Sequence, residues 1–120
     1  TLPGALAETD IAAWVAERGI TTLTLCGYMT HNCVMSTAVE AVHKGLAVEY
    51  LHDASGTVSY ANAQGNASAE ELHRVFGVVM HSRFAAVVAT DDWIAAITRN
   101  TALPRSTIYA SHLAAVEALA

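Results

Sequence analysis

A predicted strand, a tight turn and a predicted helix follow one another early in the chain, and they constrain the fold more than any other stretch. Apolar residues alternate with threonines along Ile20–Cys26, a pattern that predicts a strand. The helix predicted over Val34–Lys44 ends at Gly45, a residue type common just past a helix end. The turn between them, Gly27–Cys33, therefore delivers Cys33 to the first turn of a helix.

The position of Cys33 favours a reactive thiol. A helix N-terminus carries unpaired N–H groups and a partial positive charge, and both stabilise an anion such as a thiolate. Many free cysteines are inert packing residues, however, so position alone leaves a catalytic and a structural Cys33 equally open. Cys26 lies within the apolar strand, and we expect it to be a core residue. Two cysteines so placed are not a disulfide framework, which favours the cytoplasm.

The rest of the chain continues the alternation of strands and helices. The predicted elements are strands over 46–52 and 85–89, helices over 10–18, 69–82, 93–98 and 107–119, and a loop over 58–67. Thr9, Ser68 and Ser106 are the expected N-caps. Strands that alternate with helices form right-handed crossovers on a parallel sheet. We therefore predict an α/β fold, a three-layer, Rossmann-like sandwich to which this chain contributes about three strands.

The composition is unusually apolar for a short chain, with 53% hydrophobic and 14% charged residues. A small domain needs a polar coat, so we expect a large face to be covered by another chain or by further sequence. The net charge of −5 and six scattered basic residues argue against a nucleic-acid partner. No apolar run reaches the ~20 residues of a membrane span. We expect residues 1–99 to belong to one domain and residues 100–120 to be a linker and a helix that packs against another subunit.

The run G-Y-M-T-H-N-C-V-M-S-T-A-V-E-A-V-H-K-G, which begins at Gly27, resembles the signature of the isochorismatase-like cysteine hydrolases. This superfamily includes nicotinamidases and N-carbamoyl-amide hydrolases. Its pattern is G-x-x-T-x-x-C-V, then T-A and A at helical spacing, a glycine before an apolar strand, and D-A at that strand's end. The matching residues are Gly27, Thr30, Cys33, Val34, Thr37, Ala38, Ala41, Gly45, Asp53 and Ala54. The resemblance covers about residues 2–97.

The resemblance implies that Cys33 is the nucleophile of a hydrolase that cleaves the C–N bond of a small amide through a thioester. Backbone N–H groups of Met29 and Cys33 would form the oxyanion hole, and the Tyr28–Met29 bond would be a cis peptide. The side chains of Tyr28, Thr30 and His31 would line the substrate pocket. Three alternatives stay open: an isochorismatase-type vinyl ether hydrolase, a non-catalytic binding or assembly subunit, and a thiol enzyme that pairs Cys33 with His31.

The resemblance also implies an Asp and a Lys that assist the cysteine, and both would precede Thr1. Lys44 is the only lysine of the chain, and it lies eleven residues beyond Cys33. That spacing is about 16 Å along a helix, too far to reach the thiol. Asp53 matches a position that is structural in the family. We therefore expect this chain to be the C-terminal portion of a longer enzyme, whose preceding strands, or another chain, complete the sheet.

We expect no metal and no other cofactor on these residues. None of the six histidines has the spacing of a metal pair or a zinc motif. In nicotinamidase-type members that carry a metal, the resemblance places its ligands upstream of this chain. His43, His73 and His112 are expected to face solvent, and His81 to be a cation at a helix end. The expected partners are a small-molecule substrate and further copies of the chain, as a dimer or tetramer, without nucleic acid or membrane.

Overall fold

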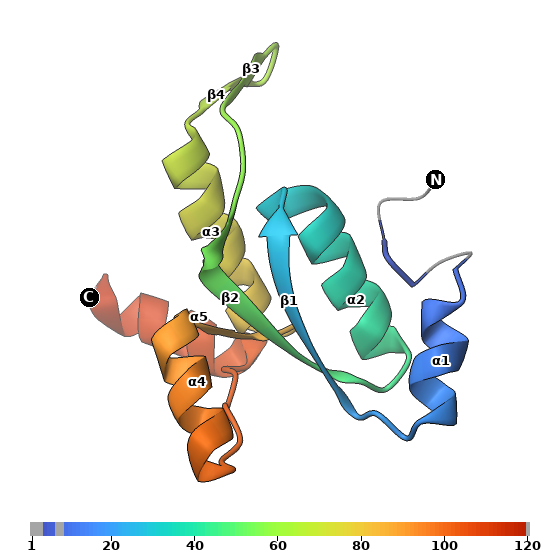
Figure 1. The fold of residues 1–120 in the computed structure, drawn as a ribbon. Coiled ribbons are helices and arrows are strands. Elements are labelled where there is room, and N and C mark those ends of the chain that lie inside the picture. The colour runs from blue at the N-terminus through green and yellow to red at the C-terminus, as the bar shows by residue number, and fades with distance from the viewer. Residues whose placement is uncertain (1–3, 7–8, 120) are drawn as a thin grey trace.

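The structure, a computed structural model, describes residues 4–6 and 9–119 of the chain (Figure 1). It contains five α-helices, five strands and one π-helical turn among these residues. In chain order they are α1 (Ile11–Glu17), β1 (Thr22–Tyr28), η1 (Thr30–Val34), α2 (Met35–His43), β2 (Ala47–Gly56), β3 (Tyr60–Asn62), β4 (Gly65–Ala67), α3 (Ala69–His81), β5 (Ala86–Val88), α4 (Thr90–Arg99) and α5 (Ile108–Ala118).

The main sheet has three parallel strands in the order β1-β2-β5, which confirms the predicted α/β class. Thr22 pairs with Ala47 at one end of β1, and β5 pairs with residues 49–51 of β2 on its other side. Helices α2 and α3 pack on one face of the sheet and α4 packs on the other, so the layers are helix, sheet and helix. Because β2 is central, β1 is a free edge of the sheet within the described residues.

The core lies between the sheet and the α2–α3 layer. It combines Val48 and Tyr50 from β2 with Ala38 and Ala41 from α2 and Met80 from α3. The two alanines are completely buried. Their small side chains allow the axis of α2 to approach the strands closely, as close packing requires. This face of β2 therefore anchors the helix that carries the candidate site at its N-terminal end.

Several helix ends follow from local sequence. Ser68 caps α3 by accepting the N–H of Glu71 at 3.1 Å, as predicted. Gly45 follows α2 with a φ of +81°, a value that glycine adopts without strain. The cap of α5 is Thr107 and not Ser106, because the Ser106 hydroxyl lies 2.9 Å from the Ser111 hydroxyl instead. The N-cap of α1 is Asp10 and not Thr9, whose hydroxyl donates to the carbonyl of Ala5.

The loop expected over residues 58–67 is instead largely an antiparallel hairpin of β3 and β4, which projects from the body of the molecule (Figure 1). Its turn contains Gly65, with a φ of +129°, and Gln64, whose N–H is accepted by the Asn62 side chain at 2.9 Å. The segment is rich in small polar residues and lacks a strand-like alternation, so the pattern pointed to a loop.

The expectation that Cys26 is a core residue is wrong. The burial of β1 alternates, and Cys26 lies on its more exposed face. Trp93 of α4 reaches this face at Thr24, where its indole N–H donates to the threonine hydroxyl at 3.2 Å. Cys26 lies two residues further along the edge strand, beyond that contact. Its exposure follows from the position of β1 at the sheet edge.

No helix among residues 9–119 combines the length and the apolar character needed to cross a membrane. Helix α5 lies at the periphery (Figure 1), and the Ser106 N–H just before it donates to the carbonyl of His81 at the end of α3. Helix α5 follows an irregular connection that begins at Asn100, which ends α4 in the left-handed conformation with a φ of +53°. The division of the chain at residue 99 stays a prediction.

Candidate active site

The turn after β1 places Cys33 at the carboxyl end of the parallel sheet. Gly27 has a φ of +126°, which a residue with a side chain rarely adopts, and the Tyr28–Met29 peptide bond is cis. Met29 is extended, and its carbonyl accepts the N–H groups of Asn32 at 3.1 Å and Val34 at 3.3 Å. These bonds begin η1, which continues into α2. Cys33 is the fourth residue of this helical segment and therefore lies in its first turn.

The Cys33 side chain is exposed and faces a small, largely apolar cleft of about 220 Å³. The cleft is lined by Ala5, Leu25, Cys26, Tyr28, Cys33, Val34 and Thr37. Thr37 donates its hydroxyl to the Cys33 carbonyl at 2.8 Å and accepts the N–H of Ala5 at 2.9 Å. No side chain in the described part of the chain hydrogen-bonds to the Cys33 thiol. The cleft thus presents a free thiol beside apolar walls, without an acid or base from these residues.

Thr30 holds the turn in place through hydrogen bonds of its buried side chain. Its side chain is completely buried, and its hydroxyl accepts a hydrogen bond from the Tyr50 hydroxyl at 3.1 Å. The same hydroxyl lies 3.1 Å from the Gly56 carbonyl and 2.7 Å from Nδ1 of His73. These contacts join the turn to β2 and α3. Thr30 was expected to line the substrate pocket, but its burial makes it a support of the turn in this structure.

His73 is half-buried, so the expectation that it faces solvent is wrong. Its Nε2 lies 2.8 Å from the carbonyl of His52. A carbonyl oxygen can only accept, so Nε2 carries a hydrogen. Sequence reasoning could have found this residue, because His73 precedes Phe76 by three positions and Met80 by seven, the spacing of one buried helix face.

His31 connects the turn to the β3–β4 hairpin. Its Nε2 lies 3.0 Å from the hydroxyl of Tyr60, and its Nδ1 lies 2.8 Å from the hydroxyl of Thr57. The Tyr60 ring meets the imidazole edge-on at a centroid distance of 5.2 Å, and the centroid of the Phe76 ring lies 5.7 Å from it at an interplanar angle of 49°. The Tyr60 hydroxyl also lies 3.7 Å from Sδ of Met29. Tyr60 and Thr57 were missed, because no sequence periodicity relates the hairpin to the turn.

Asp53 has a structural role that agrees with the position it matches in the family pattern. Leu25 of β1 pairs with Tyr50 of β2, but Gly27, two residues further along β1, pairs with Ser55, five residues further along β2. Strand β2 therefore bulges around Asp53. The Asp53 carboxylate accepts the N–H of Thr90 at 2.9 Å and its hydroxyl at 2.6 Å. These bonds from Thr90, the side-chain bond foremost, hold the pKa of Asp53 below its usual value. Asp53 thereby fixes the start of α4.

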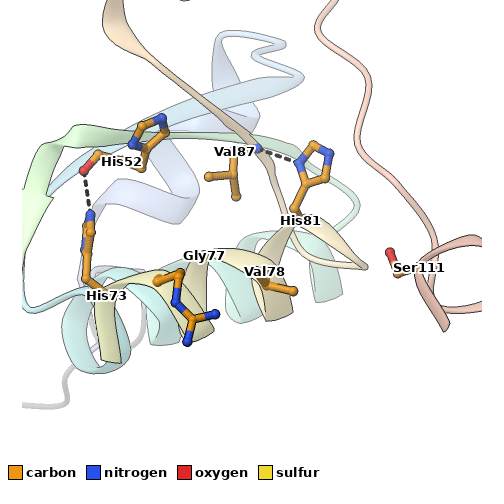
Figure 2. Close-up of a pocket in the computed structure, with 8 residues that line it drawn as sticks. His52, His73, Gly77, Val78, His81, Val87 and Ser111 are labelled. Atoms are coloured by element: carbon orange, nitrogen blue, oxygen red, sulfur yellow. Dashed lines mark hydrogen bonds between the residues drawn. The ribbon is translucent and has the colours of Figure 1, made fainter. Parts of the chain in front are cut away.

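A second and larger cleft of about 520 Å³ lies between α3 and α5 (Figure 2). His52, His73, His81 and Arg74 contribute its polar lining. Nδ1 of His81 accepts the N–H of Val87 at 3.0 Å, which requires a neutral nitrogen there. The expectation of a cationic His81 is therefore wrong. Across residues 4–6 and 9–119, no three His, Cys, Asp or Glu side chains are grouped as metal ligands would be.

The other residues singled out from the sequence lie as follows. Lys44 ends α2, at the opposite end of that helix from Cys33. His43 and His112 are exposed. Tyr28 lines the Cys33 cleft and is 61% exposed.

Comparison with known proteins places this geometry in a family. The family model described as the isochorismatase domain matches residues 1–92, which contain the whole sheet and the Cys33 turn. The chain belongs to the isochorismatase family. Three residues of the turn lie within the matched range. Gly27 has a positive φ, the side chain of Thr30 is buried, and the thiol of Cys33 is exposed.

Three solved structures show how isochorismatase-family proteins resemble this chain. A protein of Burkholderia xenovorans LB400, provisionally classed as an isochorismatase, is 61% identical, with a TM-score of 0.93 over 96% of this chain and 55% of its own. A cysteine hydrolase from Pseudomonas syringae pv. phaseolicola 1448A is 25% identical, with a TM-score of 0.79 over 82% and 46%. A nicotinamidase from Bacillus subtilis is 31% identical, with a TM-score of 0.60 over 73% and 44%. The chain spans about half the length of these relatives.

Proposed function

We propose that the protein hydrolyses the C–N bond of a small amide, with Cys33 as the nucleophile. The observation that carries this proposal is the exposed thiol of Cys33 in the first turn of a helix, beside a cleft at the carboxyl end of the sheet. Ligands of parallel α/β sheets bind at this end. The similarity to a cysteine hydrolase and to a nicotinamidase, which is an amide hydrolase by name, supports the choice of reaction.

The proposed reaction has two steps. The Cys33 thiolate attacks the carbonyl carbon of the amide, and the carbonyl oxygen takes up the negative charge. The C–N bond then breaks, the amine leaves with a proton, and the acyl group stays on Sγ as a thioester. Water attacks the thioester, which releases a carboxylate and restores the thiol. Backbone N–H groups of Met29 and Cys33 are the proposed oxyanion hole for both steps.

The groups that move the protons are proposed to come from outside the described residues. Within them, Lys44 lies at the far end of α2, and the carboxylate of Asp53 is held by Thr90. An Asp that takes the thiol proton and a Lys that stabilises the thiolate are therefore proposed to lie in the half of the relatives' length that this chain does not cover. The contribution of the chain itself is the nucleophile, the helix N-terminus and the rigid turn.

The test compares Cys33→Ser and Cys26→Ser in the intact protein, with a panel of small amides and one vinyl ether as substrates. Both cysteines are exposed in the described part of the chain, so either thiol could be the nucleophile on exposure alone. We expect Cys33→Ser to lower turnover by at least about 10³-fold, because a hydroxyl at this position is not ionised. Denaturing mass spectrometry after acid quench should detect an acyl adduct on Cys33 in the wild type and in Cys26→Ser.

Each outcome of this test is decisive. Acylation of Cys26, or full amide turnover by Cys33→Ser, would contradict the assignment of the nucleophile. Turnover of the vinyl ether alone would show that the protein is a hydrolase whose substrate is a vinyl ether and not an amide. Binding of the panel without turnover in the wild type would favour a non-catalytic binding subunit.

A further inference from the structure

His73 lies between the cleft that separates α3 from α5 and the turn that carries Cys33. Its half-buried imidazole lines that cleft, and Figure 2 shows its bond to the carbonyl of His52, where Nε2 lies 2.8 Å from the oxygen. Its Nδ1 lies 2.7 Å from the hydroxyl of Thr30, whose side chain is completely buried. His73 is therefore a path by which a proton from the cleft can reach the hydrogen bonds of Thr30.

The hydrogens of this network can be assigned for a neutral imidazole. Because the His52 carbonyl can only accept, Nε2 carries the hydrogen and Nδ1 has a lone pair. The Thr30 hydroxyl then has two acceptors within reach, Nδ1 of His73 at 2.7 Å and the Gly56 carbonyl at 3.1 Å. A hydroxyl donates one hydrogen, so the neutral network leaves one of these acceptors without its bond from Thr30.

A proton on Nδ1 removes this competition. The imidazolium donates from both nitrogens, to the His52 carbonyl and to the Thr30 hydroxyl. The oxygen of Thr30 can accept this hydrogen as well as the one from Tyr50, because a hydroxyl has two lone pairs. The hydrogen of Thr30 is then free for the Gly56 carbonyl. The charged form therefore has one hydrogen bond more than the neutral form.

The Gly56 carbonyl connects the Thr30 hydroxyl to the strand end beside the turn. Gly56 ends β2 and pairs in register with Tyr28, the last residue of β1. The residue after Tyr28 is Met29, whose N–H is one of the two proposed oxyanion donors. A bond from Thr30 to Gly56 therefore ties the first residue of η1 to the backbone that lies opposite this N–H.

We propose that His73 is a positioning residue for the turn, and that its protonation state sets whether the Thr30 hydroxyl donates to His73 or to Gly56. The charged form holds the turn more firmly, because it adds a hydrogen bond without giving one up. His73 acts through Thr30 and does not touch the substrate. The consequence for turnover rests on the proposed function, whereas the consequence for the rigidity of the turn does not.

Other titratable side chains lie on the elements around His73. They are Tyr50 and His52 on β2, His31 in η1, and Glu70, Arg74 and His81 on α3 itself. Helix α5 contributes Ser111 to the cleft, a side chain that does not titrate. The histidines among these residues change their charge in the same range as His73, between about pH 5 and 8. The experiment must therefore separate His73 from its histidine neighbours.

The test is amide hydrogen exchange of the intact protein, expressed as protection factors between about pH 5 and 8. The reporters are the N–H groups of Asn32 and Val34, both bonded to the Met29 carbonyl. The reference is the Leu46 N–H, bonded to the Ala41 carbonyl at 2.9 Å at the other end of α2. The ratio of reporter to reference protection should rise at least about threefold from pH 8 to pH 5, as expected for one hydrogen bond.

Two variants of His73 should remove this dependence on pH in opposite ways. His73→Asn places an amide near the position of Nδ1, and its N–H can donate to Thr30 at every pH. The protection ratio should therefore stay close to the wild-type value at pH 5. His73→Leu offers Thr30 no partner, so the ratio should stay close to the wild-type value at pH 8. If His73→Leu does not fold, the constant ratio of His73→Asn decides.

The controls leave His73 in place. His52→Gln and His81→Asn each remove one neighbouring imidazole of the cleft, and His43→Leu removes an exposed imidazole on α2. All three should keep the wild-type rise. His31 is present in every variant, so a rise that a His73 variant loses does not come from His31 alone. A wild type without the rise, a folded His73 variant that keeps it, or a control that loses it would overturn the inference.

Turnover tests the link to the proposed function separately. Wild type and His73→Leu carry the same Cys33 thiol, so its titration cancels in the ratio of their kcat values. This ratio, wild type over variant, should rise about threefold from pH 8 to pH 5 with nearly equal KM. An exchange rise in a protein without amide turnover would contradict the proposed function and support the role of His73. Amide turnover without the exchange rise would do the reverse.

Discussion

Replacement of Thr30 by valine is the sharpest test of how the turn is held. The substitution keeps the branched shape of the side chain and replaces the hydroxyl with a methyl group of similar size. Thr30 is completely buried, and its hydroxyl contacts Tyr50, Gly56 and His73 at 3.1, 3.1 and 2.7 Å. Among the buried hydroxyls of the described residues, that of Thr30 has the most such contacts, and valine leaves the packing volume at this position nearly unchanged.

The magnitude follows from counting hydrogens. The Thr30 hydroxyl accepts one hydrogen from Tyr50 and has one hydrogen to donate, to Gly56 or to His73. The valine variant therefore loses two hydrogen bonds and leaves the buried Tyr50 hydroxyl without its acceptor. A buried group left unpaired costs about 1–3 kcal/mol, so we expect a loss of about 2–4 kcal/mol in the free energy of unfolding. A typical domain has a free energy of unfolding of about 5–15 kcal/mol, so this loss is a large share of it.

The assay is urea unfolding of the intact protein at a fixed protein concentration, followed by tryptophan fluorescence. Tyr50→Phe and the double variant complete a thermodynamic cycle. Because the double variant has no unpaired tyrosine hydroxyl, it should cost about 1 kcal/mol less than the sum of the two single changes. A loss below about 0.5 kcal/mol for Thr30→Val, or strict additivity in the cycle, would refute the role given to this hydroxyl.

Two further predictions concern groups around the turn. The pKa of Asp53 is lowered by its bonds from Thr90. These bonds therefore stabilise the fold above pH 3.8, the ordinary pKa of an aspartate, and the stabilisation is lost as the pH falls through the lower pKa of the folded state. Asp53→Asn should therefore lower stability at pH 7 and leave it unchanged at the acid end, measured by urea midpoints; equal losses at both pH values would contradict this. Tyr60→Phe removes the hydroxyl that meets His31 and Met29, and it should lower kcat about tenfold with KM and the urea midpoint nearly unchanged. A change in KM alone would instead place Tyr60 at the substrate.

The local patterns of the sequence were sufficient for the framework. The alternation along β1, the helix over residues 34–44, Gly45 and the Ser68 cap each depend on neighbours within a few positions, and all appear in the structure. The parallel sheet followed from the alternation of strands with helices along the chain. The position of Cys33 in a first helical turn belongs to this set, because the turn joins two elements that the sequence already defines.

Only the tertiary structure decided which faces are covered and which side chains meet. Cys26 is exposed because β1 is the free edge, a fact that no pattern within the strand contains. His73 reaches Thr30 from 43 residues away, and Tyr60 reaches His31 from 29 residues away. Periodicity shows which residues share a face but not what packs against it. The side-chain contacts that hold the turn therefore appear only when the elements are assembled.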